Sequence, residues 1–196
     1  MTKIVAIDGV CRSGKSTVIE TLTRNNPKIG KIQEYSDYAN EEYPTFPPAS
    51  PAIQVENVRN YMFQLELRRL DDLKKLKSKE TVLVDRCYAT SCAFDYAASV
   101  ETGFDVAAEV ELIWSNNADK IQPDKIVILD VEYQEQMRRL GTDIHRFVPI
   151  LYNPAFNQRF KQYLMQNARI FSREVVIIDT TLLTPEQVYA RVQNEI

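Results

Sequence analysis

The feature that most constrains this chain is a glycine-bounded loop near the N-terminus. Residues 9–16 read GVCRSGKS, which fits the pattern G-x-x-x-x-G-K-S. Residues 3–8, KIVAID, have the apolar character of a short buried strand, and a helical pattern begins near Lys15. Between a strand and a helix, the glycines let backbone N–H groups turn inward around an anion, and the helix offers the positive end of its dipole to the same anion. The segment therefore predicts a phosphate-binding loop.

The residue types of this loop suit the triphosphate of ATP or a similar nucleotide. Lys15 would reach the β- and γ-phosphates, and the Ser16 hydroxyl would coordinate the Mg²⁺ that accompanies ATP. Arg12 could lean across the bridge between the β- and γ-phosphates, the alternative being a solvent-facing loop residue. We expect the phosphates to contact the whole segment: Gly9, Val10, Cys11, Arg12, Ser13, Gly14, Lys15, Ser16 and Thr17.

Other apolar runs have the length of buried strands and alternate with longer helical stretches. They lie at residues 81–85 (TVLVD), 125–130 (KIVILD) and 174–179 (EVVIID), with a weaker run near 31–34. Runs that are apolar on both faces and end in Asp are typical of a parallel sheet covered by helices on both sides. The pattern predicts an α/β fold.

Three further segments can be assigned from their spacing. Apolar residues recur at intervals of three and four over 53–77, which predicts one long packed helix. The preceding segment, 41–51, holds four of the nine prolines and predicts an irregular surface loop that could border an acceptor pocket. Thr184 followed by a proline and an acidic residue predicts an N-cap and a last helix over 185–195.

Length and composition limit the classes that remain. A chain of 196 residues with 44% hydrophobic and 26% charged residues is expected to form a single folded domain, 1–196. A net charge of -3 gives no global positive field for nucleic acid, and neither a leader nor an apolar run of the ~20 residues that span a bilayer is visible. We therefore expect a cytoplasmic protein with no nucleic-acid or membrane partner. The three cysteines lack metal-ligand spacing and are interpreted as free thiols.

Small-molecule kinases, regulatory GTPases and ATPases that couple hydrolysis to motion all use such a loop. The guanine-reading tetrapeptide N-K-x-D of GTPases does not occur in the sequence. Motor and remodelling ATPases usually end a strand in Asp-Glu, whereas the strands here end in Asp85-Arg86 and Asp130-Val131. An Arg beside a strand-end Asp suits the holding of an anion or of transferred charge. The sequence favours an ATP-dependent kinase.

A family resemblance supports this interpretation. Residues 81–97, TVLVDRCYATSCAFDYA, resemble the thymidylate kinase signature, and the related deoxynucleoside kinases have Glu-Arg-Ser at the same strand end. The loop text GVCRSGKST also resembles that of eukaryotic-type thymidylate kinases, in which Arg occupies the position of Arg12. Trp114, residues 122–124 and residues 153–164 continue the similarity in order.

The resemblance implies a P-loop NTPase fold of nucleoside-monophosphate-kinase type, with a five-stranded parallel sheet flanked by helices. It also implies a short lid near 138–152 that closes over the donor phosphates. Arg138, Arg139 and Arg146 would complete the site on closure, the alternative being a solvated basic helix end; the only histidine, His145, is interpreted as a surface residue of the lid. Dimers are common in the resembling families, so a homodimer remains open.

The departures from the family concern the acceptor. Thymidylate kinases carry, at the position of Cys11, an Asp that contacts the sugar hydroxyl of the acceptor. Glu34 instead follows the second strand, where the resembling deoxynucleoside kinases keep a catalytic Glu that takes the proton from the accepting hydroxyl. An unphosphorylated alcohol is therefore a possible acceptor. The alternative for Glu34 is an exposed turn residue.

Strand-end residues complete the predicted site. Asp85 would act as a base or support Mg²⁺ together with Ser16, the alternative being a helix N-cap. Arg86 is expected to pair with an anion, because a buried guanidinium is costly otherwise. The predicted catalytic set is Lys15, Arg12, Asp85, Arg86 and Glu34.

The leading hypothesis is an ATP- and Mg²⁺-dependent kinase of a nucleoside or nucleoside monophosphate. One alternative is a kinase of another small alcohol or metabolite on the same scaffold, since fold does not fix function. The other is a non-catalytic nucleotide-binding regulatory protein, for which Arg86 and Glu34 would be incidental.

Overall fold

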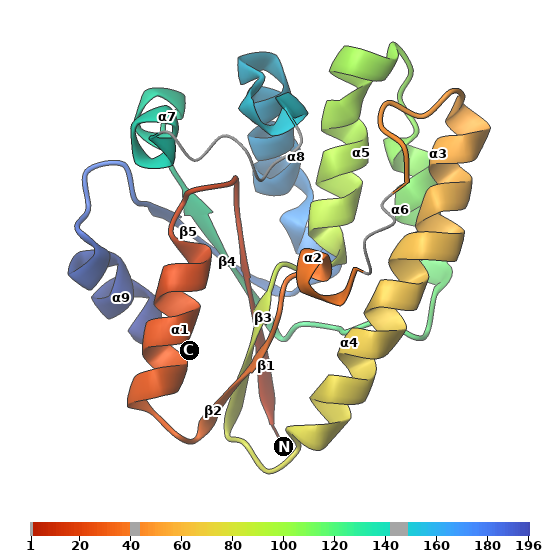
Figure 1. Ribbon diagram of the computed structural model, residues 1–196. Helices are drawn as coiled ribbons and strands as arrows, with labels where there is room; N and C mark the ends of the chain where they lie inside the picture. Colours follow the sequence, from red (N-terminus) through yellow and green to blue (C-terminus); the bar gives the residue numbers. More distant parts are fainter. Residues whose placement is uncertain (1, 40–43, 142–148) are drawn as a thin grey trace.

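The computed structural model describes residues 2–39, 44–141 and 149–196, and these contain one parallel sheet of five strands (Figure 1). The strands follow the order β2-β3-β1-β4-β5 across the sheet. Their bounds are β1 Lys3–Asp8, β2 Ile29–Ile32, β3 Thr81–Asp85, β4 Lys125–Asp130 and β5 Glu174–Asp179. The predicted α/β fold with a five-stranded parallel sheet is confirmed. The weak second strand lies two residues earlier than the sequence suggested, so it ends before Glu34.

Helices cover both faces of the sheet because side chains along each strand alternate between the two faces. Val5 and Ile7 of β1 belong to a core formed with the helices α1 (Lys15–Asn25) and α9 (Pro185–Gln193). Ala6 between them belongs to the larger core on the opposite face. That second layer is formed by the helices α4 Phe63–Lys75, α5 Tyr88–Thr102, α6 Ala107–Asn116 and α8 Pro154–Phe171.

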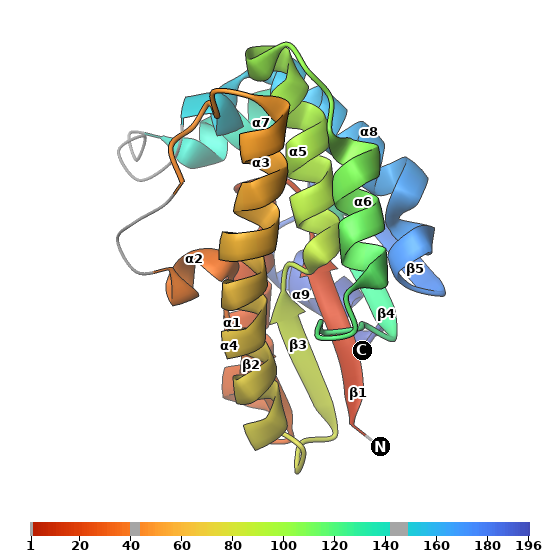
Figure 2. The ribbon, with the colours of Figure 1, turned by 90° about the vertical axis from the view of Figure 1, so that its right-hand side faces the viewer.

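The long helix predicted over 53–77 is present, but it is not regular throughout. It runs from α3 (Pro51–Asn57) through a π-helical turn η1 (Val58–Met62) into α4. Figure 2 shows α3 and α4 as one column beside α5. A π-turn shifts the register of the residues on either side of it and is frequent at functional sites. The periodicity of apolar residues alone did not reveal this turn.

Shorter elements complete the described chain. They are α2 Tyr35–Tyr38, α7 Tyr133–Leu140 and the 3-10 turn η3 Pro149–Tyr152. The predicted cap of α9 is confirmed, because the Thr184 side chain accepts from Gln187 N and Gln187 reaches back to Thr184 N, although the helix ends at Gln193. Within the described ranges, we find no helix with the length and apolar character needed to cross a membrane.

The carboxyl ends of β1, β3 and β4 meet at the edge of the sheet where the glycine loop begins, because neighbouring strands are parallel. Gly9 packs tightly against β4 at this point. A Cβ at Gly9 would lie 2.2 Å from the Leu129 carbonyl oxygen, and the residue has a φ of 131°. Only glycine therefore lets the loop leave β1 in this direction.

We predict that Gly9→Ala lowers the free energy of unfolding by about 3 kcal/mol or more, because the methyl group overlaps a backbone carbonyl at a strained φ. Gly103→Ala is the matched control. Gly103 also has a positive φ, of 75°, but no atom lies within 4 Å of its added Cβ, so we expect a loss of about 1 kcal/mol. Urea denaturation of the two variants measures the difference, and equal losses would contradict the close approach at Gly9.

Candidate active site

The loop between β1 and α1 turns through three residues with positive φ: Gly9 at 131°, Arg12 at 61° and Gly14 at 101°. Gly14 caps α1, and Lys15 is the first residue of that helix. Positive φ is uncommon for a residue with a side chain, and such strain is typical of functional sites. The strand, the turn and the helix therefore occur where the sequence predicts them, and the loop places the N-terminus of α1 beside the end of β1.

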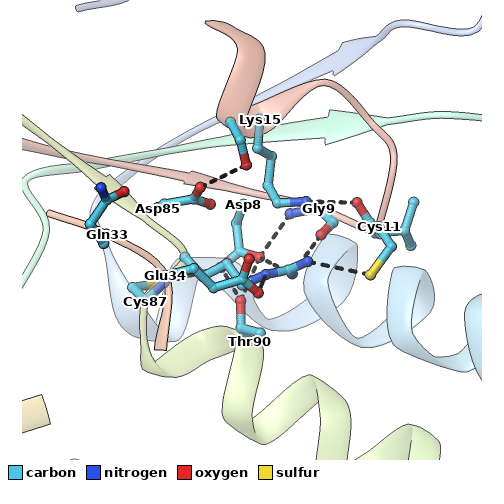
Figure 3. A network of polar contacts seen from close by, with 12 residues as sticks. Asp8, Gly9, Cys11, Lys15, Gln33, Glu34, Asp85, Cys87 and Thr90 are labelled. Atoms are coloured by element: carbon cyan, nitrogen blue, oxygen red, sulfur yellow. Dashed lines mark hydrogen bonds and ion pairs between the residues drawn. The ribbon is translucent and has the colours of Figure 1, made fainter. Parts of the chain in front are cut away.

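Lys15 lies inside this loop. Its side chain is buried, and Nζ donates a hydrogen bond to the Val10 carbonyl oxygen at 2.8 Å (Figure 3). Burial, helped by the charge of Arg86, lowers the pKa of Lys15 below its usual range, against the opposing effects of Asp85 and Glu34. A bound polyphosphate would offset the cost of burying this ammonium group.

Ser16 and Asp85, the two residues that the sequence analysis assigns to Mg²⁺, lie in contact at the strand ends. The Ser16 hydroxyl donates to Asp85 Oδ2 at 3.0 Å. Asp85 Oδ1 is buried and accepts no hydrogen bond from the described residues. Burial raises the pKa of Asp85 above its usual range, although Lys15 opposes the shift. A hydroxyl beside a buried carboxylate oxygen fits a hydrated Mg²⁺. Among the described residues, no group of three His, Cys, Asp or Glu side chains converges as a metal site.

Arg86 joins three segments of the site, and the residues that it contacts, Glu34, Gly9 and Cys11, are labelled in Figure 3. Its Nε donates to Glu34 Oε1 at 2.6 Å, and its Nη1 donates to the Gly9 carbonyl oxygen at 2.8 Å. Nη2 lies 3.7 Å from Cys11 Sγ. Arg86 directly follows β3 with a φ of 62°, and it is only 6% exposed. The pairing of Arg86 with an anion, expected from the sequence, takes place within the protein, and the anion is Glu34.

The contact with Arg86 also determines the charge of Glu34. Burial acts to raise the pKa of Glu34, but the nearby charges of Arg86 and Lys15, together with the hydrogen bond from Arg86, hold it below its usual range. Burial likewise opposes the charge of Arg86, yet Glu34 raises the pKa of the guanidinium above its ordinary value. Both groups are therefore ionised at neutral pH. Glu34 keeps about a third of its side chain exposed, so its carboxylate is accessible from the cavities described below.

Asp8 is a buried centre of contacts that sequence reasoning treated only as the end of a strand. It is the last residue of β1 and is fully buried. Its carboxylate accepts from Gly9 N at 2.7 Å and from Thr90 Oγ1 at 2.6 Å, and Arg86 Nη1 lies 3.9 Å away. These contacts fix the beginning of the loop against β3 and α5. The Asp that ends four of the five predicted strands was the available signal, but its position gave no indication of these partners.

A cavity of about 440 Å³ surrounds the outer side of the loop. Arg138 and Arg139 of α7, which the sequence analysis assigns to the donor side, line this cavity. Arg139 donates to Thr180 Oγ1 at 3.2 Å and to the Arg12 carbonyl oxygen at 3.4 Å. Arg138 is exposed and is held by Glu135 at 2.6 Å. Of the predicted lid, residues 142–148 lie outside the described part of the chain, and these include His145 and Arg146.

A second cavity, of about 620 Å³, lies on the other side of the Glu34–Arg86 pair. We call it the inner cavity. Its wall is mostly apolar, and it is bordered by α3, the π-turn and α5. Residues 44–46 and Pro48, which belong to the predicted proline-rich loop, also line it. Both cavities are lined by the same three residues at their junction: Cys11, Glu34 and Arg86.

Sequence reasoning did not identify a buried ion pair that lies behind the strand ends. Arg69 of α4 is fully buried and donates to Glu66 Oε2 at 2.9 Å. It also donates to the carbonyl oxygens of Gln33 at 3.2 Å, Asp85 at 3.0 Å and Arg86 at 2.6 Å. It therefore ties the segments that carry Glu34, Asp85 and Arg86 to one rigid helix. A charged pair at i,i+3 on an amphipathic helix looks like a surface pair in sequence, which is why no signal distinguished it.

Comparison with known proteins decides the family. A family model described as thymidylate kinase matches residues 61–192, which is more than half of the chain. This chain belongs to the thymidylate kinase family. No curated protein matches the sequence significantly. Solved structures share the fold. The thymidylate kinase of Candida albicans has a TM-score of 0.64 and 18% identity over 100% of this chain and 91% of its own.

The deoxyadenosine kinase of M. mycoides with bound dATP is also similar, with a TM-score of 0.66 and 19% identity over 98% of each chain. At such identities these likenesses establish the fold. The family match and the motif together make the chain an ATP-dependent phosphotransferase, a nucleotide kinase.

We predict that Arg69→Met lowers the free energy of unfolding of this kinase by about 3–5 kcal/mol, because it leaves the buried Glu66 carboxylate and several backbone carbonyls without their donor. Lys74→Met is the matched control, since Lys74 forms an exposed i,i+3 pair with Asp71 on the same helix and should matter little. Urea denaturation compares the two variants. A loss in Arg69→Met as small as that of the control would contradict the anchoring role.

Proposed function

We propose that this kinase transfers the γ-phosphate of Mg²⁺-bound ATP from the phosphate-binding loop to the 5′-hydroxyl of a nucleoside held in the inner cavity. The observation that carries the proposal is the junction of the two cavities. A carboxylate, Glu34, and a guanidinium, Arg86, stand where the space around the loop meets the apolar space beyond it. Phosphoryl transfer needs the acceptor oxygen and the γ-phosphate to meet in line at one point.

On the donor side, we assign the amides of residues 9–17 and the ammonium group of Lys15 to the β- and γ-phosphates. The Ser16 hydroxyl and, through water, Asp85 would hold Mg²⁺. When bound, the ion offsets the negative charge on the phosphate oxygens. Arg12 and Arg139 line the same cavity, and their positions support a role in stabilising the charge of the transferred group.

On the acceptor side, we assign the general-base role to Glu34. Its carboxylate is ionised, partly exposed and oriented by the 2.6 Å contact with Arg86. The O–H bond of the acceptor breaks, its proton passes to a Glu34 carboxylate oxygen, and the alcohol oxygen forms the new bond to phosphorus as the bridge to ADP breaks. Arg86 would stabilise the transferred phosphoryl group while it keeps Glu34 in place.

The charges of the inner cavity favour an uncharged acceptor. Among the described residues that line it, the ionisable groups are Cys11, Glu34, Tyr35, Tyr61, Arg86 and Asp95. The only basic group of this set, Arg86, is already paired with Glu34. A phosphate dianion would have to displace that pair or meet two carboxyl groups. Binding of an uncharged nucleoside in the cavity does not carry this cost.

A nucleoside monophosphate is the second candidate, because the matched family is described as thymidylate kinase. It would require Glu34 to release Arg86, which could then bind the acceptor phosphate. The two candidates differ in the part played by Glu34: it supplies a base in the first and must move aside in the second.

We predict that ADP release is stimulated by nucleosides and that Glu34→Gln lowers the turnover number with a nucleoside by about 100-fold or more, because the proton acceptor is lost. The affinity for ATP should stay within about twofold, since Glu34 is not among the groups assigned to its phosphates. Coupled measurement of ADP release with nucleosides and with their monophosphates gives the turnover, and a fluorescent ATP analogue gives the affinity.

Lys15→Ala is the control, because the variant should lose nucleotide binding itself. Stimulation by monophosphates alone, with turnover retained in Glu34→Gln, would replace the nucleoside proposal with the monophosphate one. No stimulation by either class would remove the inner cavity as the acceptor site.

A further inference from the structure

The inner cavity holds one buried polar pair away from the reaction centre. Gln54 of α3 and Asp95 of α5 line the cavity and are only 4% and 5% exposed. Gln54 Nε2 donates to Asp95 Oδ1 at 2.6 Å. Asp95 lies seven residues into α5, which is about 10 Å along the helix axis from its first residue beside the β3 end. This distance is comparable to the length of a nucleoside, so the pair lies where the ring of an acceptor would reach.

The pair is not satisfied by the protein. The Oε1 atom of Gln54 is buried and accepts no hydrogen bond from the described residues. The only hydrogen bond that those residues give the Asp95 carboxyl group is the one from Gln54 to Oδ1. An unmet acceptor in an apolar wall is costly, and it is usually explained by a ligand or a water molecule that supplies the donor. Two oxygens, Gln54 Oε1 and Asp95 Oδ2, are therefore available to accept hydrogen bonds from a ligand.

The ionisation of Asp95 sets what the pair can recognise. Burial, with a smaller effect from the charge of Asp105, raises the pKa of Asp95 to about 7, against the hydrogen bond from Gln54. Above that pH the carboxyl group is ionised and only accepts hydrogen bonds. An exocyclic amino group has two hydrogens to donate to two such acceptors. A carbonyl oxygen at the same position of a ring would face them with lone pairs, which is repulsive and leaves both unmet.

We propose that Gln54 and Asp95 form the specificity site for the acceptor ring and select a nucleobase with an exocyclic amino group over one with a carbonyl group at the same position. The inference rests on the proposed function, since it takes the inner cavity as the acceptor site. It goes further by naming the chemical class of the base and the residues that read it. The apolar and aromatic wall, which includes Phe46 and Phe94, would hold the faces of either kind of ring alike. Gln54 and Asp95 would therefore distinguish a base with an amino group from a base with a carbonyl group.

Two pairs of nucleosides test the proposal. In each pair a carbonyl group replaces the amino group at the same ring position, and the neighbouring ring nitrogen gains a hydrogen. The pairs are deoxycytidine with deoxyuridine and deoxyadenosine with deoxyinosine. At about pH 8, where the carboxylate is ionised, we expect kcat/KM to favour the amino member of each pair by about tenfold or more. Asp95→Asn supplies an amide donor that can meet a carbonyl oxygen, so the ratio should fall by about tenfold.

Asp71→Asn is the matched control, because Asp71 is exposed on α4 and does not line the cavity; its ratio should equal that of the unaltered kinase. A ratio is insensitive to a general loss of folded protein, so a poorly folded Asp95→Asn preparation still gives an answer. Equal use of both members by the unaltered kinase, or an unchanged ratio in Asp95→Asn, would overturn the specificity role.

The same panel, repeated with the corresponding monophosphates, keeps the two proposals distinguishable. Phosphorylation of nucleosides without discrimination overturns this inference and leaves the proposed function intact. Discrimination among monophosphates, with no turnover of nucleosides, supports the specificity site and overturns the nucleoside acceptor. No turnover with any member overturns both.

Discussion

The contact on which the site depends is the bridge that the Arg86 guanidinium makes between Glu34 and the Gly9 carbonyl oxygen. It connects the segments that follow β2 and β1 with the end of β3, so one buried side chain sets the spacing of donor loop and acceptor cavity. A guanidinium with little exposed surface is stable only when its charge and its N–H groups are matched, which the carboxylate and the carbonyl achieve together. The bridge also explains why Glu34 is ionised despite its partial burial.

A second guanidinium, that of Arg69, supports the first from behind. It holds the backbone carbonyls of Asp85 and Arg86 while Glu66 balances its charge and also accepts from Ile121 N. The unusual φ of Arg86 is thus fixed on both sides, by contacts to its side chain and to its carbonyl oxygen. Backbone strain of this kind persists where surrounding contacts over-determine the geometry. The parallel sheet brings the chain segments together, and the two arginines fix the positions of the functional groups at its edge.

Much of the fold followed from the sequence because its signals are local. The glycine loop, the apolar runs that end in Asp and the Thr184 cap each depend on residues a few positions apart, and each was found where predicted. The placement of Arg86 beside an anion could also be expected from the cost of burying its charge. What the sequence concealed depends on contacts between distant segments. In the sequence, Arg69 and Glu66 resemble a surface pair. Gln54 and Asp95, which form a hydrogen bond between two helices, are 41 positions apart in the chain.

In the arrangement that we propose, ATP and a nucleoside approach the Glu34–Arg86 pair from opposite sides, one through the loop and the other through the inner cavity. The most direct measurement is a crystal structure of the kinase with a bisubstrate analogue in which a polyphosphate joins adenosine to a nucleoside. We predict polyphosphate along residues 9–17, the acceptor ring between α3 and α5, and Glu34 about 3 Å from the oxygen that joins the two halves. An acceptor ring bound outside the inner cavity, or a polyphosphate that avoids the loop, would contradict it.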